Sequence, residues 1–244
     1  MSGKYVVAID LGGTKIYTGL VDFEGNIKKE IKVDTEADKG VGKIVEKIKN
    51  TINYVIKDIE KDSIRAIGIG SPGPLNVKKG IIQSPPNLPF KNYNIVEVLE
   101  KEFNLPTFLD NDANCATLAE HLFGKGKGLE NLVYITVSTG IGAGAILNGK
   151  IYRGSTSNAL EVGHTTIEGK GVVCGCGNFG CSEALSSGTA IAKRGREIKE
   201  SNAYTTLKNY DNITAREVFE EYSNGDLMAN IILEDALRNL GILV

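Results

Sequence analysis

The sequence predicts an α/β protein in which one folding unit occurs twice. Short apolar strands alternate with helices of three- and four-residue apolar period, and the strand pattern of residues 5–33 recurs at residues 132–152. A glycine-rich turn occupies the same place in both copies. With 244 residues, 41% of them hydrophobic, the chain is long enough for two lobes with a cleft between them.

The first copy begins with a three-stranded meander at residues 5–10, 16–22 and 26–33, joined by hairpin connections. Apolar residues then recur every three or four positions from Val41 to Ile59, which predicts a helix with one buried face. The remaining elements expected in this half are a strand at residues 64–70, a helix near residues 95–103 and a strand at residues 106–110.

The second copy repeats the meander and continues with helices. Thr214 and Glu217 have the spacing of a capping box, which marks a helix start. The expected elements are strands at residues 132–137, 144–147 and 150–152 and helices near residues 183–201, 214–222 and 226–240. Because the apolar residues 240–244 follow without a further strand, we expect a second lobe that lacks its last strands. The expected lobes are residues 1–115 and 116–244.

Charge and hydropathy exclude several classes of partner. The 28 basic and 30 acidic residues give a formal net charge of −2, so no global positive field attracts nucleic acid or an anionic membrane. The apolar stretch before Asp10 has only five residues (5–9), too few for a signal peptide, and no apolar run approaches the roughly 20 residues of a membrane span. We therefore expect a cytoplasmic protein whose four cysteines are not disulfides by default.

The first glycine-rich turn is a candidate phosphate site. It lies between two strands, where backbone N–H groups can converge on an anion without interference from Cβ atoms. Asp10 fits beside phosphates if a hydrated Mg²⁺ lies between them; the alternative is a structural hairpin with a capping aspartate. The residues proposed for this turn are Asp10, Gly12, Gly13, Thr14 and Lys15.

The second glycine-rich turn carries Thr139, Gly140, Ile141 and Gly142. A strand and not a helix is expected after it, which excludes the dinucleotide-binding fingerprint. Residues 124–128 have the wrong spacing for a P-loop. A nucleotide would therefore be held by the two hairpin turns, facing each other across the cleft.

A polar turn joins the strand at residues 106–110 to a helix. Asp112 at the helix N-terminus would be ionised and placed to accept a proton from a substrate hydroxyl, with Asp110 as the helix cap. Three polar residues before a helix are also ordinary capping residues, and this alternative stays open. On the helix, Cys115 is expected to be a small buried residue and His121 a surface residue.

His164, Cys174, Cys176 and Cys181 fall within eighteen positions, separated largely by small and turn-forming residues. Three thiolates and one imidazole are the ligands of a closed, structural zinc site, in which the metal orders a loop. Disulfide pairing is the alternative, but three cysteines cannot all pair with one another.

Taken together, the ordered motifs resemble the ROK family of sugar kinases and sugar-responsive repressors. They are DLGGTK at residues 10–15, GSPGP at 70–74, NDAN at 111–114, STGIGAG at 138–144, EVGH at 161–164 and CGCGNFGCSE at 174–183. The resemblance implies an actin-like, ribonuclease-H-like two-lobed fold that binds ATP, Mg²⁺ and a hexose, with a structural Zn²⁺ and a homodimer or homotetramer. It also implies that Asp112 is the catalytic base. The implied sugar-binding residues are Asn87, Asn111, Asp112, Glu161, His164 and Glu183.

This chain departs from the family pattern in two places. Leu160 precedes Glu161 where the family usually has a small residue, and the family's late glycine-rich segment that cradles adenosine is not found. The function expected is ATP-dependent phosphorylation of a hexose, such as glucose, N-acetylmannosamine, N-acetylglucosamine or fructose. The alternative is a sugar-binding or sensing fragment of the same family that does not turn over.

Overall fold

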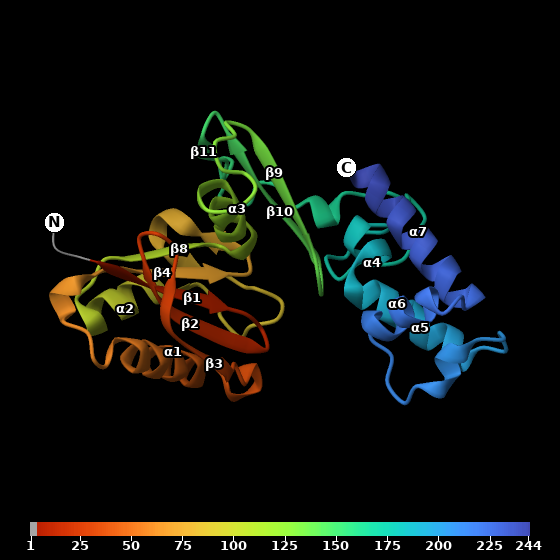
Figure 1. Cartoon of the computed structure of the whole chain (residues 1–244), viewed down its shortest axis with the longest axis horizontal. Coiled ribbons are helices and arrows are strands. Elements are labelled where there is room, and N and C mark those ends of the chain that lie inside the picture. The colour runs from red at the N-terminus through yellow and green to blue at the C-terminus, as the bar shows by residue number, and fades with distance from the viewer. Residues whose placement is uncertain (1–3) are drawn as a thin grey trace. The chain divides into compact units, whose positions relative to one another are not determined.

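The computed structural model describes residues 4–244, and the chain divides into two compact units (Figure 1). The first unit comprises the chain up to Tyr134 together with Gly144–Ala159. The second comprises Ile135–Ala143 and Leu160–Val244. The two lobes expected from the sequence, residues 1–115 and 116–244, stay a prediction.

A five-stranded sheet of order β3-β2-β1-β4-β8 forms the centre of the first unit. β1, β2 and β3 make the predicted antiparallel meander, while β4 and β8 add to it in parallel. Both parallel strands therefore end at the same edge of the sheet as the β1 strand, whose last residues enter the first glycine-rich turn. The strands are β1 (Tyr5–Leu11), β2 (Lys15–Asp22), β3 (Ile27–Asp34), β4 (Ile64–Ser71) and β8 (Thr107–Asn111).

Helices α1 (Val41–Ile56) and α2 (Ile95–Phe103) bury their apolar sides in one core with this sheet. Ile44, Ile48 and Ile52 of α1 recur every four residues and are fully buried, so the helix predicted from this periodicity is confirmed. This core fixes the orientation of the sheet edge that carries the candidate site.

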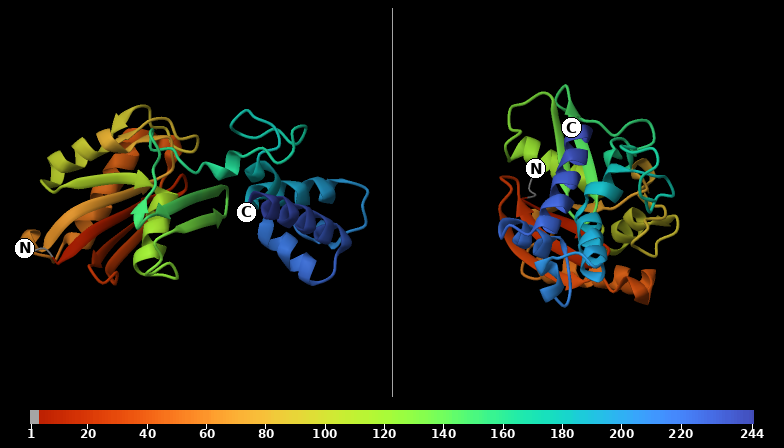
Figure 2. Two further views of the ribbon diagram at one scale, coloured as in Figure 1. Left: turned by 90° about the horizontal axis from the view of Figure 1, so that it is seen from above. Right: turned by 90° about the vertical axis from the view of Figure 1, so that its right-hand side faces the viewer.

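Helix α3 (Asp112–Leu122) follows β8 directly and packs on the other side of the sheet. Side chains along β4 alternate between faces: Ile67 and Ile69 lie in the core with α1 and α2, whereas Gly70 faces α3. A Cβ on Gly70 would lie 3.4 Å from Cys115 Sγ of α3. Figure 2 shows α3 on the opposite side of this sheet from α2.

Two smaller three-stranded sheets complete the strand content. The sheet of order β5-β6-β7 was not predicted, because each of its strands has only two residues: β5 (Leu75–Asn76), β6 (Ile81–Ile82) and β7 (Tyr93–Asn94). The sheet of order β11-β10-β9 confirms the second meander, with β9 (Leu132–Val137), β10 (Ile141–Leu147) and β11 (Lys150–Ile151).

The second unit is built around helices, whose shared core includes Leu207, Val218 and Leu233. The predicted capping box is present, since Thr214 and Glu217 exchange side-chain and backbone hydrogen bonds. The single helix expected near residues 183–201 is wrong: extended backbone at Ser187 divides it, and the Ser187 side chain caps the second part. The helices are α4 (Ser182–Ser186), α5 (Gly188–Glu200), α6 (Ala215–Ser223) and α7 (Leu227–Leu243).

Short 3₁₀ helices lie at Ala37–Lys39, Lys61–Ser63, Val77–Lys79, Val162–His164 and Thr206–Asn209. Among residues 4–244, no helix combines the length and the apolar character that crossing a lipid bilayer requires.

Candidate functional site

The first glycine-rich turn is a tight hairpin at the end of β1. The Gly12 N–H donates to the Lys15 carbonyl at 2.9 Å, and the Thr35 hydroxyl donates to the Gly12 carbonyl at 2.7 Å. These bonds fix the backbone of the turn from within and from the residue that follows β3. The turn thus has the rigidity that a backbone anion site requires.

Asn87 packs against this turn. A Cβ on Gly13 would lie 2.9 Å from Asn87 Cβ and 3.0 Å from the Asn87 carbonyl oxygen, so only glycine fits at position 13. Thr14 is exposed, and the Lys15 ammonium forms an ion pair with Asp34 on β3. A proposed sugar-binding residue and the proposed phosphate turn are therefore neighbours in the first unit.

The turn before α3 is held by Asn111. Its side-chain oxygen accepts hydrogen bonds from the backbone N–H groups of Ala113 at 2.9 Å and Asn114 at 3.3 Å. The prediction that Asp110 caps this helix is wrong; Asn111 is the N-cap, because β8 continues to that residue. The exposed Asp112 carboxylate accepts from the Ala113 N–H at 2.8 Å, which sets its orientation at the helix N-terminus.

Three carboxylates lie at this edge of the sheet. The pKa of Asp10 is raised above its usual range, mainly by partial burial and secondly by the negative charge of the Asp112 carboxylate. Asp110 is instead paired, because the Arg153 guanidinium donates to it from Nε at 2.8 Å and from Nη2 at 2.6 Å. Burial raises the pKa of Cys115 to about 12, so its thiol stays protonated beside these groups.

Helix α3 is packed closely on a second side by β10. A Cβ on Gly144 would lie 2.2 Å from Thr117 Oγ1 and 3.1 Å from the Ala113 carbonyl oxygen. His121, expected at the surface, is instead half-buried, and its ring Nδ1 is buried without a hydrogen-bond partner among the described residues. This packing leaves the helix that carries Asp112 little freedom to shift.

The second glycine-rich turn is clamped by the junction of α4 and α5. Glu183 Oε2 accepts a hydrogen bond of 2.9 Å from the Ile141 N–H. The Gly188 N–H donates to the Ser138 carbonyl at 2.7 Å, and the Thr189 hydroxyl donates to the Thr139 carbonyl at 2.8 Å. The turn proposed for phosphate and a residue proposed for sugar thus meet within the second unit.

The Glu161–His164 segment lies against the same turn. A Cβ on Gly163 would lie 2.3 Å from the Ile141 carbonyl oxygen, so the backbones are in direct contact. Leu160 adopts a φ of 64°, the left-handed region that glycine occupies without strain. A Cβ at this position therefore brings backbone strain, which a glycine would not.

The predicted zinc ligands come together. One ligand atom from each of His164, Cys174, Cys176 and Cys181 lies within 4.8 Å of the others, and all four cysteines of the chain are free. The Cys176–Cys181 Sγ separation is 3.7 Å, as is that between Cys174 Sγ and His164 Nδ1. A tetrahedral site with metal–sulfur bonds of about 2.3 Å has an S–S edge of about 3.8 Å, so this donor set fits zinc.

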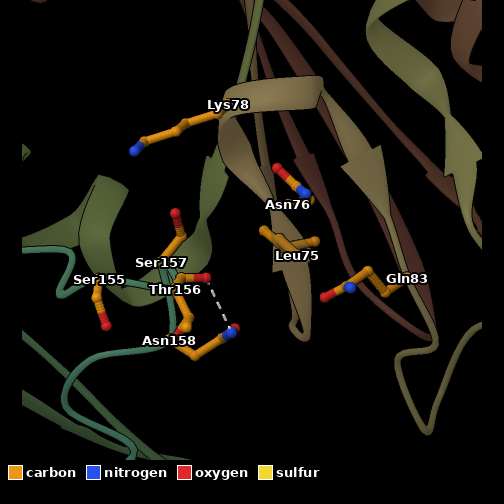
Figure 3. Close-up of a pocket in the computed structure, with 8 residues that line it drawn as sticks. All are labelled: Leu75, Asn76, Lys78, Gln83, Ser155, Thr156, Ser157 and Asn158. Atoms are coloured by element: carbon orange, nitrogen blue, oxygen red, sulfur yellow. Dashed lines mark hydrogen bonds between the residues drawn. The ribbon is translucent and has the colours of Figure 1, made fainter.

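The first unit also contains a polar cavity of about 450 Å³ (Figure 3). Its walls are the β5–β6 hairpin, with Leu75, Asn76, Lys78 and Gln83, and residues 155–158. The Asn158 side chain donates to the Thr156 carbonyl at 3.1 Å, which shapes this loop. The loop begins two residues after Arg153.

The site residues expected from the sequence form one group in each unit. The first unit holds Asp10, Gly12, Gly13, Thr14, Lys15, Asn87, Asn111 and Asp112. The second holds Thr139, Gly140, Ile141, Gly142, Glu161, His164, Glu183, Cys174, Cys176 and Cys181. That the two glycine-rich turns face each other across a cleft remains a prediction.

Sequence reasoning missed Arg153. Its partner Asp110 is 43 residues away, and no charge pattern links the two positions. The only available signal is an arginine placed directly after a predicted strand and before the conspicuous polar loop that leads to Glu161.

The fold and the two glycine-rich turns define an α/β protein of the actin-like type. The ROK family model matches residues 6–244, and the chain belongs to the ROK family. A glucokinase from Thermotoga maritima is 34% identical over 232 residues, which cover 93% of this chain and 72% of the relative. A xylose repressor from Caldicellulosiruptor bescii is 31% identical over 97% of this chain and 61% of its own length.

The solved structures include a ROK family glucokinase from Streptomyces griseus in complex with glucose and AMPPNP. It superimposes with a TM-score of 0.83 at 30% identity, covering 98% of this chain and 77% of that one. The family thus contains both sugar kinases and sugar-linked repressors, and both kinds match nearly the whole of this chain.

Proposed function

We propose that the protein transfers a phosphoryl group from ATP to a hydroxyl of a hexose. The observation that carries this proposal is the placement of Asp112 at the N-terminus of α3, close enough to Asp10 of the first glycine-rich turn to raise the pKa of Asp10. An alcohol-activating carboxylate beside a backbone anion site is what phosphoryl transfer to a sugar requires.

In this proposal, Asp112 is the catalytic base. The transition state of phosphoryl transfer is loose, so the attacking hydroxyl loses its proton late and Asp112 chiefly orients the hydroxyl and collects the proton. Its hydrogen bond from the Ala113 N–H leaves the other carboxylate oxygen, Oδ2, for the substrate. The residues proposed to bind the sugar hydroxyls are Asn87, Asn111, Glu161, His164 and Glu183.

The two glycine-rich turns are proposed to bind the phosphates. Asp10 is proposed to hold Mg²⁺, which when bound offsets the charge of the phosphate groups. Zinc itself would take no part in the chemistry: it would fix His164, which is also proposed to bind the sugar, and the loop that leads to Glu183. We further propose a cytoplasmic location, and a homodimer or homotetramer remains an expectation.

The test is formation of a sugar phosphate. The purified chain is incubated with ATP·Mg²⁺ and with glucose, fructose, N-acetylmannosamine or N-acetylglucosamine in turn, and the products are identified by mass spectrometry. One hexose is expected to gain a phosphoryl group while ATP is converted to ADP. ATP hydrolysis without sugar phosphate, or no reaction with any hexose, contradicts the proposal.

The second candidate is a sugar-responsive protein that does not turn over. It is favoured by the match of the xylose repressor to 97% of this chain. Calorimetry together with the product assay distinguishes the two candidates. A sugar-responsive protein would bind a sugar but form no sugar phosphate in the presence of ATP·Mg²⁺.

A further inference from the structure

Arg153, two residues after β11, contacts the segment that carries Asp112. Its guanidinium places both Nε and Nη2 on one oxygen, Asp110 Oδ2, at 2.8 and 2.6 Å. The Asp110 side chain is only 13% exposed and that of Arg153 37%. Two charge-assisted hydrogen bonds from one guanidinium hold this oxygen in place.

The other oxygen of Asp110 holds the start of α3. Asp110 Oδ1 accepts from the Asn111 N–H at 2.8 Å and from Asn114 Nδ2 at 3.1 Å. Asn111 in turn accepts from the N–H groups of Ala113 and Asn114. The carboxylate therefore divides its oxygens, one for Arg153 and one for the turn whose next residue is Asp112.

Without the guanidinium, Asp110 would be a largely buried carboxylate with no cation, one residue from Asn111 and two from Asp112. Such a carboxylate turns toward water, which withdraws Oδ1 from the Asn111 N–H. Removal of Arg153 would thus disturb the turn through Asp110, without direct contact between Arg153 and a ligand.

We propose that Arg153 is a positioning residue for the hexose site: through Asp110 it sets the orientation of Asn111 and Asp112. This inference rests on the proposed function, since it assigns these two residues to the sugar. Arg153 also lies two residues before the loop at residues 155–158 that lines the polar cavity in Figure 3. Arg153 therefore joins the turn that carries Asn111 and Asp112 to the segment that leads toward Glu161.

The experiment compares the variants Arg153→Met, Arg153→Lys and Arg65→Met. Arg65 is the matched control, because it is exposed on β4 of the same unit and forms no ion pair among the described residues. Two quantities are measured: the exchange rates of the Ala113 and Asn114 amide protons by NMR, and the hexose dissociation constant by calorimetry.

We expect Arg153→Met to speed exchange of both amides and to weaken hexose binding, each by about tenfold or more, as loss of a charged hydrogen bond predicts. Arg153→Lys keeps the charge but not the paired donors, so it should fall between Arg153→Met and the unsubstituted chain. Arg65→Met should change neither quantity. Unchanged exchange, or unchanged hexose affinity, in Arg153→Met overturns the inference.

A double-variant cycle tests whether the effect passes through Asp110. Asp110→Asn keeps an acceptor for the Asn111 N–H but loses the ion pair, and Arg153→Met should weaken hexose binding little further in that background. If the double variant loses hexose affinity by the product of the two separate losses, Arg153 does not act through Asp110 and the inference is overturned. If the unsubstituted chain binds no hexose, the proposed function itself fails; the amide exchange, which needs no sugar, shows separately whether Arg153 orders the turn.

Discussion

The Glu183 carboxylate accepts a 2.9 Å hydrogen bond from the backbone N–H of Ile141, in the middle of the second glycine-rich turn. A Cβ on the preceding Gly140 would lie 2.3 Å from Glu183 Oε2, so the glycine makes room for the carboxylate. One oxygen of Glu183 thus orders a turn proposed to bind phosphate, which leaves Oε1 for a sugar hydroxyl. Under the proposed function, Glu183 would therefore link the two ligands.

Substitution of Glu183 therefore affects both ligands. We expect Glu183→Ala to weaken both hexose and ATP·Mg²⁺ binding by about tenfold, because the turn loses its charged hydrogen bond. Glu183→Gln keeps an acceptor for the Ile141 N–H and should weaken hexose binding more than nucleotide binding. Calorimetry with each ligand alone measures both effects. An unchanged ATP·Mg²⁺ affinity in Glu183→Ala contradicts the link.

Gly163 tests the contact between the Glu161–His164 segment and the second turn. An alanine Cβ would lie 2.3 Å from a backbone oxygen, which cannot move aside as a flexible side chain can. We expect Gly163→Ala to lower the free energy of unfolding by about 2–3 kcal/mol, measured by urea denaturation. Gly169→Ala is the control, since its Cβ would meet nothing within 4 Å. Equal effects of the two substitutions would show that the contact is absent.

The four clustered ligands predict bound zinc. Purified under reducing conditions, the chain should contain about one zinc ion per molecule by elemental mass spectrometry. Cys174→Ser and Cys181→Ser should lose the metal and lower the thermal midpoint, because zinc binding stabilises only the folded chain. Cys115→Ser, a free cysteine outside the cluster, should retain it. Retention of zinc by Cys174→Ser refutes the assignment.

The ionised Asp10 side chain should lower the stability of the folded chain, and this effect should depend on pH. Its pKa in the folded chain is raised above the ordinary aspartate value of 3.8, so folding favours the protonated form and stability falls as pH rises through the raised pKa. Asp10→Asn should therefore raise the urea midpoint at pH 7, and this gain should shrink as pH falls toward 3.8. The exposed Asp62→Asn serves as the control. A gain of equal size at both pH values is inconsistent with the ionisation of Asp10 as its cause.

Local patterns in the sequence predicted the elements that depend on local chemistry. The meander of β1 to β3, the amphipathic α1 and the Thr214 capping box all follow from spacing alone, and each is present. The clustering of the four zinc ligands was also predictable, because the ligands lie close together in the chain.

Features that depend on tertiary packing were not predictable from spacing. Asn111 and not Asp110 caps α3, because β8 continues to Asn111; Asp110 instead pairs with Arg153, which lies 43 residues further along the chain. The break at Ser187 follows from the position of the second glycine-rich turn, to which Gly188 donates. The strain at Leu160 is a backbone property that a sequence pattern does not reveal.

The most direct test of the account is the rate of ATP-dependent hexose phosphorylation by Asp112→Asn. Asparagine keeps the size of the side chain and an acceptor for the Ala113 N–H, but it cannot collect the hydroxyl proton. The account predicts that kcat falls by several powers of ten while hexose affinity changes little. Wild-type turnover in Asp112→Asn would contradict it.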